Sequence, residues 1–173
     1  EGEVIVRGKS SAEFSKSDFD SYRNTYVGFV FQEYNVLNEF SVEQNIAIAL
    51  QLQNKPSTKE KVEEILKTVD LDGIGKRKPN TLSGGQKQRC AIAGIIAMQP
   101  ECIVLDEATA MLDPIGRREV INLIKKLNKE NNITIVHITH HMDEVSQADR
   151  VILIDNGIVL ADTTPRKLFS DVN

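Results

Sequence analysis

Two adjacent carboxylates follow a short apolar run in the middle of the chain. The residues from Cys102 to Leu105 predict a buried strand, and Asp106 and Glu107 come directly after it. Open α/β sheets bind ligands in the crevice beyond the carboxyl ends of their strands. One carboxylate can hold Mg²⁺ through oxygen while its neighbour orients or deprotonates a water. The pair is therefore a candidate for metal-assisted chemistry, although a single acidic pair at the start of a loop is common.

A capped helix start with two glycines precedes this strand. Ser83 and Gln86 have the spacing of a capping box, in which each side chain satisfies a backbone N–H at the start of a helix. Capping does not need Gly84 or Gly85, which each cost about 1 kcal/mol relative to alanine. Bare N–H groups at the positive end of a helix dipole suit a phosphate. The turn is thus a candidate phosphate site, and an ordinary capped helix with two tolerated glycines is the alternative.

The two motifs together are more specific than either alone. The sequences LSGGQKQR at 82–89 and IVLDE at 103–107 resemble the signature and Walker B motifs of the ABC ATPase family. This resemblance implies an α/β fold of the P-loop NTPase type, with a core sheet, flanking helices and a helical subdomain. It covers nearly the whole chain, as one partial ABC ATPase domain over residues 1–173.

The Walker A motif of that family is expected to lie upstream of this chain. Gly8-Lys9-Ser10 matches the end of the phosphate-loop pattern, but Glu3 stands where the pattern needs its first glycine. The tripeptide is more similar to the turn after an early strand of the ABC fold. We therefore expect a domain truncated at its N-terminus, whose ATPase activity as an isolated chain is doubtful.

The predicted elements place other polar residues where the family has its site. Gln32 follows an aromatic and β-branched strand at 26–31, and His140 follows a strand at 133–138 that is expected to be buried. Asp113-Pro114 is a good N-cap and N1 pair for a helix whose apolar face is Val120, Leu123, Ile124 and Leu127. Each of these polar residues also has an ordinary loop or capping explanation. His141 beside His140 leaves a one-residue ambiguity.

The resemblance implies a role for each site residue. Asp106 is expected to hold Mg²⁺ through water, with Gln32 as a second metal contact, and Glu107 to polarise the attacking water. Gln32 and His140 would also sense the γ-phosphate. The expected nucleotide-binding residues are Ser83, Gly84, Gly85, Gln86 and Asp113, of which the serine and glycines would bind ATP held by a second subunit.

Two helices are expected ahead of the signature turn. A capping box at Ser41 begins a helix that runs to about Leu52, and residues 58–69 form a one-faced amphipathic helix. By resemblance, residues from about 41 to 82 form a helical subdomain, and plain packing helices are the alternative. Near the C-terminus, Asn156-Gly157 predicts a hairpin between strands at 151–154 and 158–161.

Composition argues against a nucleic-acid partner and against a membrane span within this chain. A net charge of -4 with a pI near 5.5 argues against a nucleic-acid surface. The longest apolar run, at 90–98, is too short to span a membrane, and Cys90 and Cys102 lie in apolar runs that suit core packing in a reducing cytoplasm. If the function is transport, a separate chain must supply the membrane part. The domain is then expected to be cytoplasmic and peripheral at the inner face of the membrane.

The family resemblance implies an ATP-binding and ATP-hydrolysing subunit that powers a membrane ABC transporter, with ATP and Mg²⁺ as ligands. Its expected partners are a membrane permease and a second ABC ATPase, identical or different, in a head-to-tail dimer. The alternatives are an inactive fragment that lends only its signature face, or a non-transport ABC protein. Residues 1 to about 87 are similar to lipoprotein-release and macrolide-export ATPases, and residues from about 91 onward to energy-coupling-factor importers. The transported substrate and its direction stay open.

Overall fold

The structure, a computed structural model, describes residues 3–6, 8–22 and 26–170. Within these residues the chain forms two compact units, 1–137 and 138–173, and each is described by itself. No helix in the described ranges is long and apolar enough to cross a membrane.

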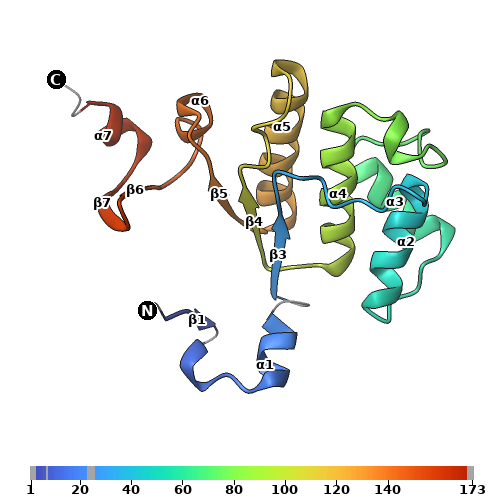
Figure 1. Cartoon of the computed structure of the whole chain (residues 1–173), viewed down its shortest axis with the longest axis horizontal. Coiled ribbons are helices and arrows are strands. Elements are labelled where there is room, and N and C mark those ends of the chain that lie inside the picture. Colours follow the sequence, from blue (N-terminus) through green and yellow to red (C-terminus); the bar gives the residue numbers. More distant parts are fainter. Residues whose placement is uncertain (1–2, 7, 23–25, 171–173) are drawn as a thin grey trace. The chain divides into compact units, whose positions relative to one another are not determined.

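The first unit contains a three-stranded sheet in the order β3-β4-β5 (Figure 1). Strand β3 (Val27–Val30) pairs in parallel with β4 (Cys102–Asp106), and β5 (Thr134–Ile138) pairs with the other edge of β4. The predicted strand after the signature helix is confirmed, and it occupies the centre of this sheet. Asp106 is therefore the last residue of the middle strand, and Glu107 follows it.

Helix α4 (Gly84–Met98) connects the rest of the unit to the sheet. It packs against β3, against α5 (Pro114–Asn131), and against α2 (Val42–Leu52) and α3 (Lys59–Thr68) (Figure 1). One apolar cluster fills the space between these elements, and its fully buried members include Ile46, Leu71, Ile92, Ile103 and Leu127. A single helix thus contacts both the sheet and the two helices that precede it.

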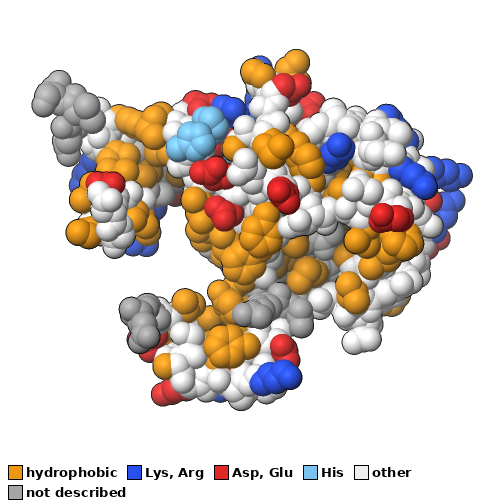
Figure 2. Space-filling view, in the orientation of Figure 1, with side chains coloured by type: hydrophobic (Ala, Val, Ile, Leu, Met, Phe, Trp, Pro, Cys, Tyr) orange, Lys and Arg blue, Asp and Glu red, His pale blue; other side chains and the backbone are white. Residues whose placement is uncertain are grey.

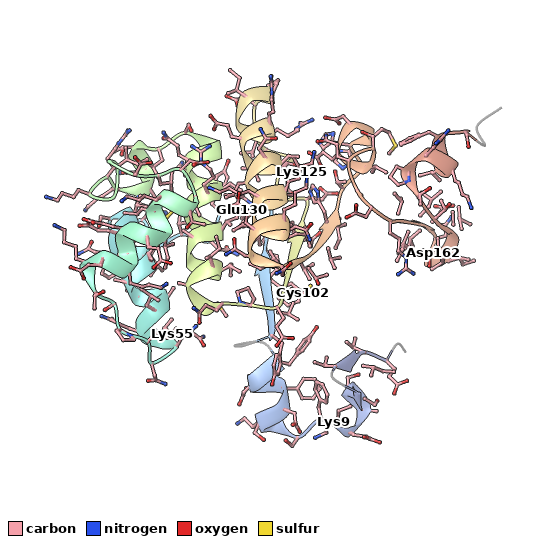
Figure 3. The ribbon with its side chains drawn as sticks, turned by 180° about the vertical axis from the view of Figure 1, so that it is seen from behind. Lys9, Lys55, Cys102, Lys125, Glu130 and Asp162 are labelled. Atoms are coloured by element: carbon pink, nitrogen blue, oxygen red, sulfur yellow. The ribbon has the colours of Figure 1, made fainter. Side chains whose placement is uncertain are left out.

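Local sequence explains where these helices begin and end. Both predicted capping boxes are present, at Ser41 with Gln44 and at Ser83 with Gln86. The Asp113 side chain accepts from the Gly116 N–H and begins α5 as predicted. The carbonyl groups at the end of α4 receive hydrogen bonds from a residue outside the helix. Lys55 Nζ donates to the carbonyls of Ala97 and Met98 at 3.3 and 2.9 Å (Figure 3). Lysine at a helix C-terminus also complements the dipole.

Close packing between β3 and α4 depends on one glycine. A Cβ atom on Gly28 would lie 2.2 Å from Ile95 Cγ2, so only glycine lets the strand approach the helix at this distance. Gly28 is therefore explained by the close packing of the strand against the helix, because glycine has a low propensity for strands.

The expectation that β5 is buried is wrong, because the described elements of the first unit leave much of its surface exposed. Ile135 packs toward the core, whereas Val136 and Ile138 on the opposite side are 45% and 49% exposed. Phe29 and Phe31 are also exposed, and Figure 2 shows hydrophobic side chains gathered over the strands at the centre of the view. The apolar run predicted burial on both faces, but helices α4 and α5 cover one.

The N-terminal residues form a small hairpin and a short helix. Strand β1 (Ile5–Val6) pairs antiparallel with β2 (Lys9–Ser10), followed by the 3₁₀ turn η1 (Ser11–Glu13) and α1 (Lys16–Ser21). A second 3₁₀ turn, η3 (Pro79–Thr81), leads into the signature helix.

The described residues of the second unit form helices α6 and α7 and a hairpin. Helix α6 (Met142–Val145) precedes β6 (Val151–Asp155) and β7 (Ile158–Thr163), and α7 (Pro165–Ser170) follows. The predicted Asn156-Gly157 turn is confirmed, with φ values of 48° and 77° that match the left-handed turn preferred between antiparallel strands. Arg150 and Asp162 form an exposed ion pair across this hairpin.

Candidate functional site

The carboxylate pair lines a cavity together with the predicted glutamine. The cavity has a volume of about 410 Å³ and is lined by Phe31, Gln32, Glu33, Asn35, Asp106 and Glu107. Gln32 lies two residues after the end of β3, Asp106 is the last residue of the neighbouring parallel strand β4, and Glu107 comes next. All three residues therefore lie at the same edge of the sheet. The topology thus brings Gln32, Asp106 and Glu107 together, although the glutamine lies more than seventy positions away in the sequence.

A change of backbone conformation lets both carboxylates face this cavity. Consecutive side chains in a strand point to opposite faces, so an uninterrupted strand would separate Asp106 from Glu107. Glu107 instead has a φ of 48°, in the left-handed region. That conformation costs about 1–2 kcal/mol for a residue with a side chain. Glu107 is thus a strained residue that lines the cavity, and strain of this kind is often found at functional sites.

The donor set of the cavity suits a hard divalent cation. Mg²⁺ is commonly bound by one or two carboxylates together with water and substrate oxygens. The cavity offers the carboxylates of Glu33, Asp106 and Glu107 and the carboxamides of Gln32 and Asn35. No group of three or more histidine, cysteine or acidic side chains in the described part of the chain could hold a metal ion. These residues therefore fit a cation that water and a phosphate would also coordinate, rather than a closed structural metal site.

The signature residues form a second group that does not line the cavity. Ser83 Oγ accepts from the Gln86 N–H at 3.2 Å, and Gln86 Oε1 accepts from the Ser83 N–H at 3.0 Å. The capping box therefore accounts for both side chains without a ligand. Asp113 begins the adjacent helix α5, and its Oδ1 lies 2.9 Å from the position of a Cβ on Gly116.

Each signature glycine has a neighbour within the chain. A Cβ on Gly84 would lie 2.9 Å from the Tyr34 hydroxyl and 3.2 Å from Leu112 Cδ2. A Cβ on Gly85 would lie 2.9 Å from Gly116 Cα. The close approach that the sequence assigned to a phosphate is thus already required by intramolecular packing. Phosphate binding at this turn stays a prediction.

The histidine pair belongs to the second unit. His140 is exposed, whereas His141 is half-buried, with its Nε2 buried and lacking a hydrogen-bond partner among the described residues. The ring centroids lie 4.3 Å apart. The Thr139 hydroxyl accepts from the His141 N–H and donates to the buried Glu144 carboxylate at 2.5 Å. His140 is the more accessible of the two, and its role stays a prediction.

Sequence reasoning missed several residues around the site. Glu33 and Asn35 line the cavity, and Gln88 and Tyr34 connect the cavity loop to α4. Asn35 has a φ of 47°, which asparagine tolerates better than most residues. One feature of the sequence could have indicated a close contact between helices: Gly116 is a glycine in the first turn of α5, a helix that already has Asp113 as its N-cap. Its contact with Gly85 could not be inferred without the fold.

Comparison with known proteins identifies relatives over most of the chain. The sequence model of the ABC transporter family matches residues 1–110. The energy-coupling factor transporter ATP-binding protein EcfA1 of Caldanaerobacter subterraneus subsp. tengcongensis is 54% identical over 148 residues, which cover 84% of this chain and 53% of that protein. EcfA1 of Clostridium novyi is 46% identical over 175 residues, covering 99% of this chain and 61% of that protein. The chain thus spans between half and two thirds of these relatives' lengths.

Solved structures show the same fold. The structure of cbiO1 from Clostridium perfringens, described as part of the ABC transporter complex cbiONQ, superposes with a TM-score of 0.85 at 29% identity, covering 96% of this chain and 67% of cbiO1. The ATP-binding cassette MJ0796, solved as a dimer bound to ADP and Pi, gives a TM-score of 0.81 at 31% identity, covering 96% and 74%. The predicted α/β fold of the ABC ATPase type is therefore confirmed, and the chain belongs to the ABC transporter family.

Proposed function

We propose that this chain forms part of an ATP-hydrolysing subunit that powers a membrane ABC transporter. The observation that carries the proposal is the cavity at the edge of the sheet, which combines Gln32 from one strand end with Asp106 and Glu107 from the next. The relatives named as transporter ATP-binding proteins support transport over a non-transport ABC function.

The residues of the cavity would divide the chemistry between them. Asp106 and Gln32 would hold Mg²⁺, whose charge offsets that of the phosphate oxygens during transfer. Glu107 would accept a proton from the attacking water. His140 belongs to the second unit and does not line the cavity, and its contact with the γ-phosphate is proposed from the family resemblance alone. Gln32 suits a shared role because a carboxamide has both an acceptor oxygen and donor hydrogens.

A composite site explains why the signature residues lie apart from the cavity. Ser83, Gly84, Gly85 and Gln86 would bind ATP held in the cavity of a second subunit, and Asp113 would face that subunit. The dimeric MJ0796 cassette supports this arrangement.

We further infer that residues 1–173 do not contain a phosphate-binding Walker A loop. Gly8-Lys9-Ser10 belongs to the β1–β2 hairpin, with Gly8 at a φ of 80° in the turn. Lys9 Nζ lies 2.8 Å from Asp18 Oδ2, so its charge is directed to a carboxylate of the same segment. A Walker A loop needs a strand before it and a long helix after it.

The proposed partners follow from family membership. A membrane permease would contact the subunit at the inner face of the membrane, and residues 41–82 would form the helical subdomain that carries this contact. EcfA1 of C. novyi aligns with 99% of the chain, which favours an energy-coupling-factor importer along its whole length. The likeness of residues 1 to about 87 to lipoprotein-release and macrolide-export ATPases stays a prediction.

The proposal is tested in a protein that joins the Walker A segment of an EcfA1 relative to residues 1–173, called here the Walker A fusion. We expect Mg²⁺-dependent ATP hydrolysis that rises more steeply than linearly with protein concentration, because two subunits complete each site. A folded fusion that binds Mg-ATP but shows no hydrolysis above background would support the alternative of an inactive chain that lends only its signature face.

A further inference from the structure

The loop that carries Gln32 has no regular structure of its own. Residues 31–41, between the end of β3 and the start of α2, form neither helix nor strand. The second half of this loop is held by Asn45 of α2. Its Oδ1 accepts from the Leu37 N–H at 2.8 Å, and its Nδ2 donates to the Leu37 and Ser41 carbonyls. The position of Gln32 must therefore depend on contacts made by its immediate neighbours.

Gln88 of α4 contacts the residue just before Gln32. Its Nε2 donates to the Phe31 carbonyl at 3.3 Å, and the side chain is fully buried. Its Oε1 is also buried and has no hydrogen-bond partner among the described residues. Burying a carboxamide costs free energy unless its hydrogen bonds are replaced, so an apolar side chain would fill this space at lower cost. The bond to Phe31 is the specific contact that the amide supplies.

Tyr34 contacts the signature turn two residues after Gln32. Its ring is partly buried against the core, and its hydroxyl occupies the space that a Cβ on Gly84 would need, 2.9 Å away. The Lys87 ammonium lies 5.7 Å from the ring centroid, within the range of a cation–π contact. The absence of a side chain at Gly84 therefore makes room for Tyr34.

These contacts attach the loop to one helix on both sides of Gln32. We propose that Gln88 and Tyr34 are positioning residues, which hold Gln32 in the cavity with Asp106 and Glu107 and link its position to the signature turn. This inference rests on the proposed ATPase function and deepens it. The residues at 31 and 34 leave only Gln32 and Glu33 between the two attachments, so movement of either attachment moves Gln32.

A fluorescent reporter tests the attachment without any need for catalysis. The chain has no tryptophan, so Tyr34→Trp introduces a single indole at the contact with Gly84 and Lys87. Adding Gln88→Met, which keeps the length of the side chain but removes the donor, should shift the emission to the red and strengthen acrylamide quenching. Val62→Ala in α3, another buried substitution in the same core, is the matched control and should leave both unchanged. Emission unaltered by Gln88→Met would overturn the proposal.

A kinetic cycle in the Walker A fusion tests positioning. Gln88→Met should lower kcat by about 10- to 100-fold with a smaller change in KM, because misplacing a contact group by about 1 Å has an effect of this size. On a Gln32→Ala background the same substitution should cause no further loss, since the group it positions is gone. Independent, additive losses would overturn the proposal. Absence of turnover in the unsubstituted fusion would instead count against the ATPase function, and the fluorescence comparison would still decide whether Gln88 holds the loop.

Discussion

Gly85 and Gly116 bring the first turns of α4 and α5 into backbone contact. A Cβ on Gly85 would fall 2.9 Å from Gly116 Cα, and a Cβ on Gly116 would fall 3.3 Å from Gly85 Cα. The buried Arg89 side chain pairs with Glu119 about one turn further along the same two helices. The signature turn and the start of the helix capped by Asp113 are therefore held to each other.

Gly85→Ala should destabilise the chain by about 1–3 kcal/mol, because inserting a methyl group into a packed contact forces the backbones apart. Urea denaturation measures the free energy of unfolding. Gly94→Ala in the same helix is the matched control, since its Cβ would meet only Ala49 Cβ at 4.0 Å. That substitution should stabilise by up to about 1 kcal/mol through helix propensity. Equal effects at the two positions would contradict the backbone contact.

Gly28→Ala should also destabilise, and a second substitution should relieve it. The added Cβ would lie 2.2 Å from Ile95 Cγ2, whereas Ile95→Ala removes that atom. Each single change should cost about 1–4 kcal/mol, one by overpacking and one by leaving a cavity. The double variant should be more stable than the sum of the two costs predicts, which a double-mutant cycle of unfolding free energies reveals. Strict additivity would mean that β3 and α4 do not meet at these residues.

Local patterns in the sequence predicted local structure well. The capping boxes at Ser41 and Ser83 and the Asn156-Gly157 turn depend on residues within a few positions of each other, and all are present. The carboxylate pair and Gln32 were placed at strand ends, and parallel pairing of β3 and β4 brought them to one cavity.

Contacts between distant segments were not predictable in the same way. Gln88 and Phe31 are 57 residues apart, and nothing in either sequence window indicates their hydrogen bond. The apolar run at β5 predicted burial, but burial depends on which elements cover a strand, and Val136 is exposed. The packing of the signature glycines against Tyr34 and Gly116 depends on the tertiary fold and could not be inferred from the sequence. The sequence pattern therefore favoured a bound phosphate as the explanation for these glycines instead.

The buried thiol of Cys90 should make stability depend on alkaline pH. Burial raises the pKa of this thiol to about 11, whereas an unfolded cysteine titrates near about 8.5. Below about 8.5 both states keep the proton and the contribution is constant. As pH rises from about 8.5 toward about 11, the unfolded chain loses a proton that the folded chain keeps, so the free energy of unfolding falls by up to about 3 kcal/mol.

The control for this pH dependence is Cys90→Ala, which removes the thiol and leaves the lysines and tyrosines that titrate in the same range. Urea denaturation of both proteins at a series of pH values isolates the thiol contribution as the difference between their slopes. Parallel profiles for the two proteins would contradict a thiol that stays protonated in the folded chain.

Residues 1–173 alone should have little affinity for ATP. The cavity presents carboxylates and carboxamides, and the inferred lack of a Walker A loop leaves no ring of N–H groups for the phosphates. A ligand at about 100 times its Kd adds about 2.7 kcal/mol of stability, and each kcal/mol raises Tm by about 2–4 °C in a domain of this size. The Walker A fusion should therefore shift by several degrees in saturating Mg-ATP, and the chain alone by less than about 1 °C. A shift of several degrees for the chain alone, absent with Mg²⁺ by itself, would show phosphate binding without that loop.

The most direct test of the proposed ATPase is turnover by the Walker A fusion with Glu107→Gln. The amide keeps the shape of the carboxylate but cannot accept a proton, so kcat should fall by about 10²- to 10⁴-fold while Mg-ATP binding is retained. Asp106→Asn should instead weaken Mg²⁺ dependence and nucleotide binding, and Glu130→Gln at the end of α5 should change neither. Undiminished hydrolysis by the Glu107→Gln protein would contradict the assignment of the cavity as the site of ATP hydrolysis.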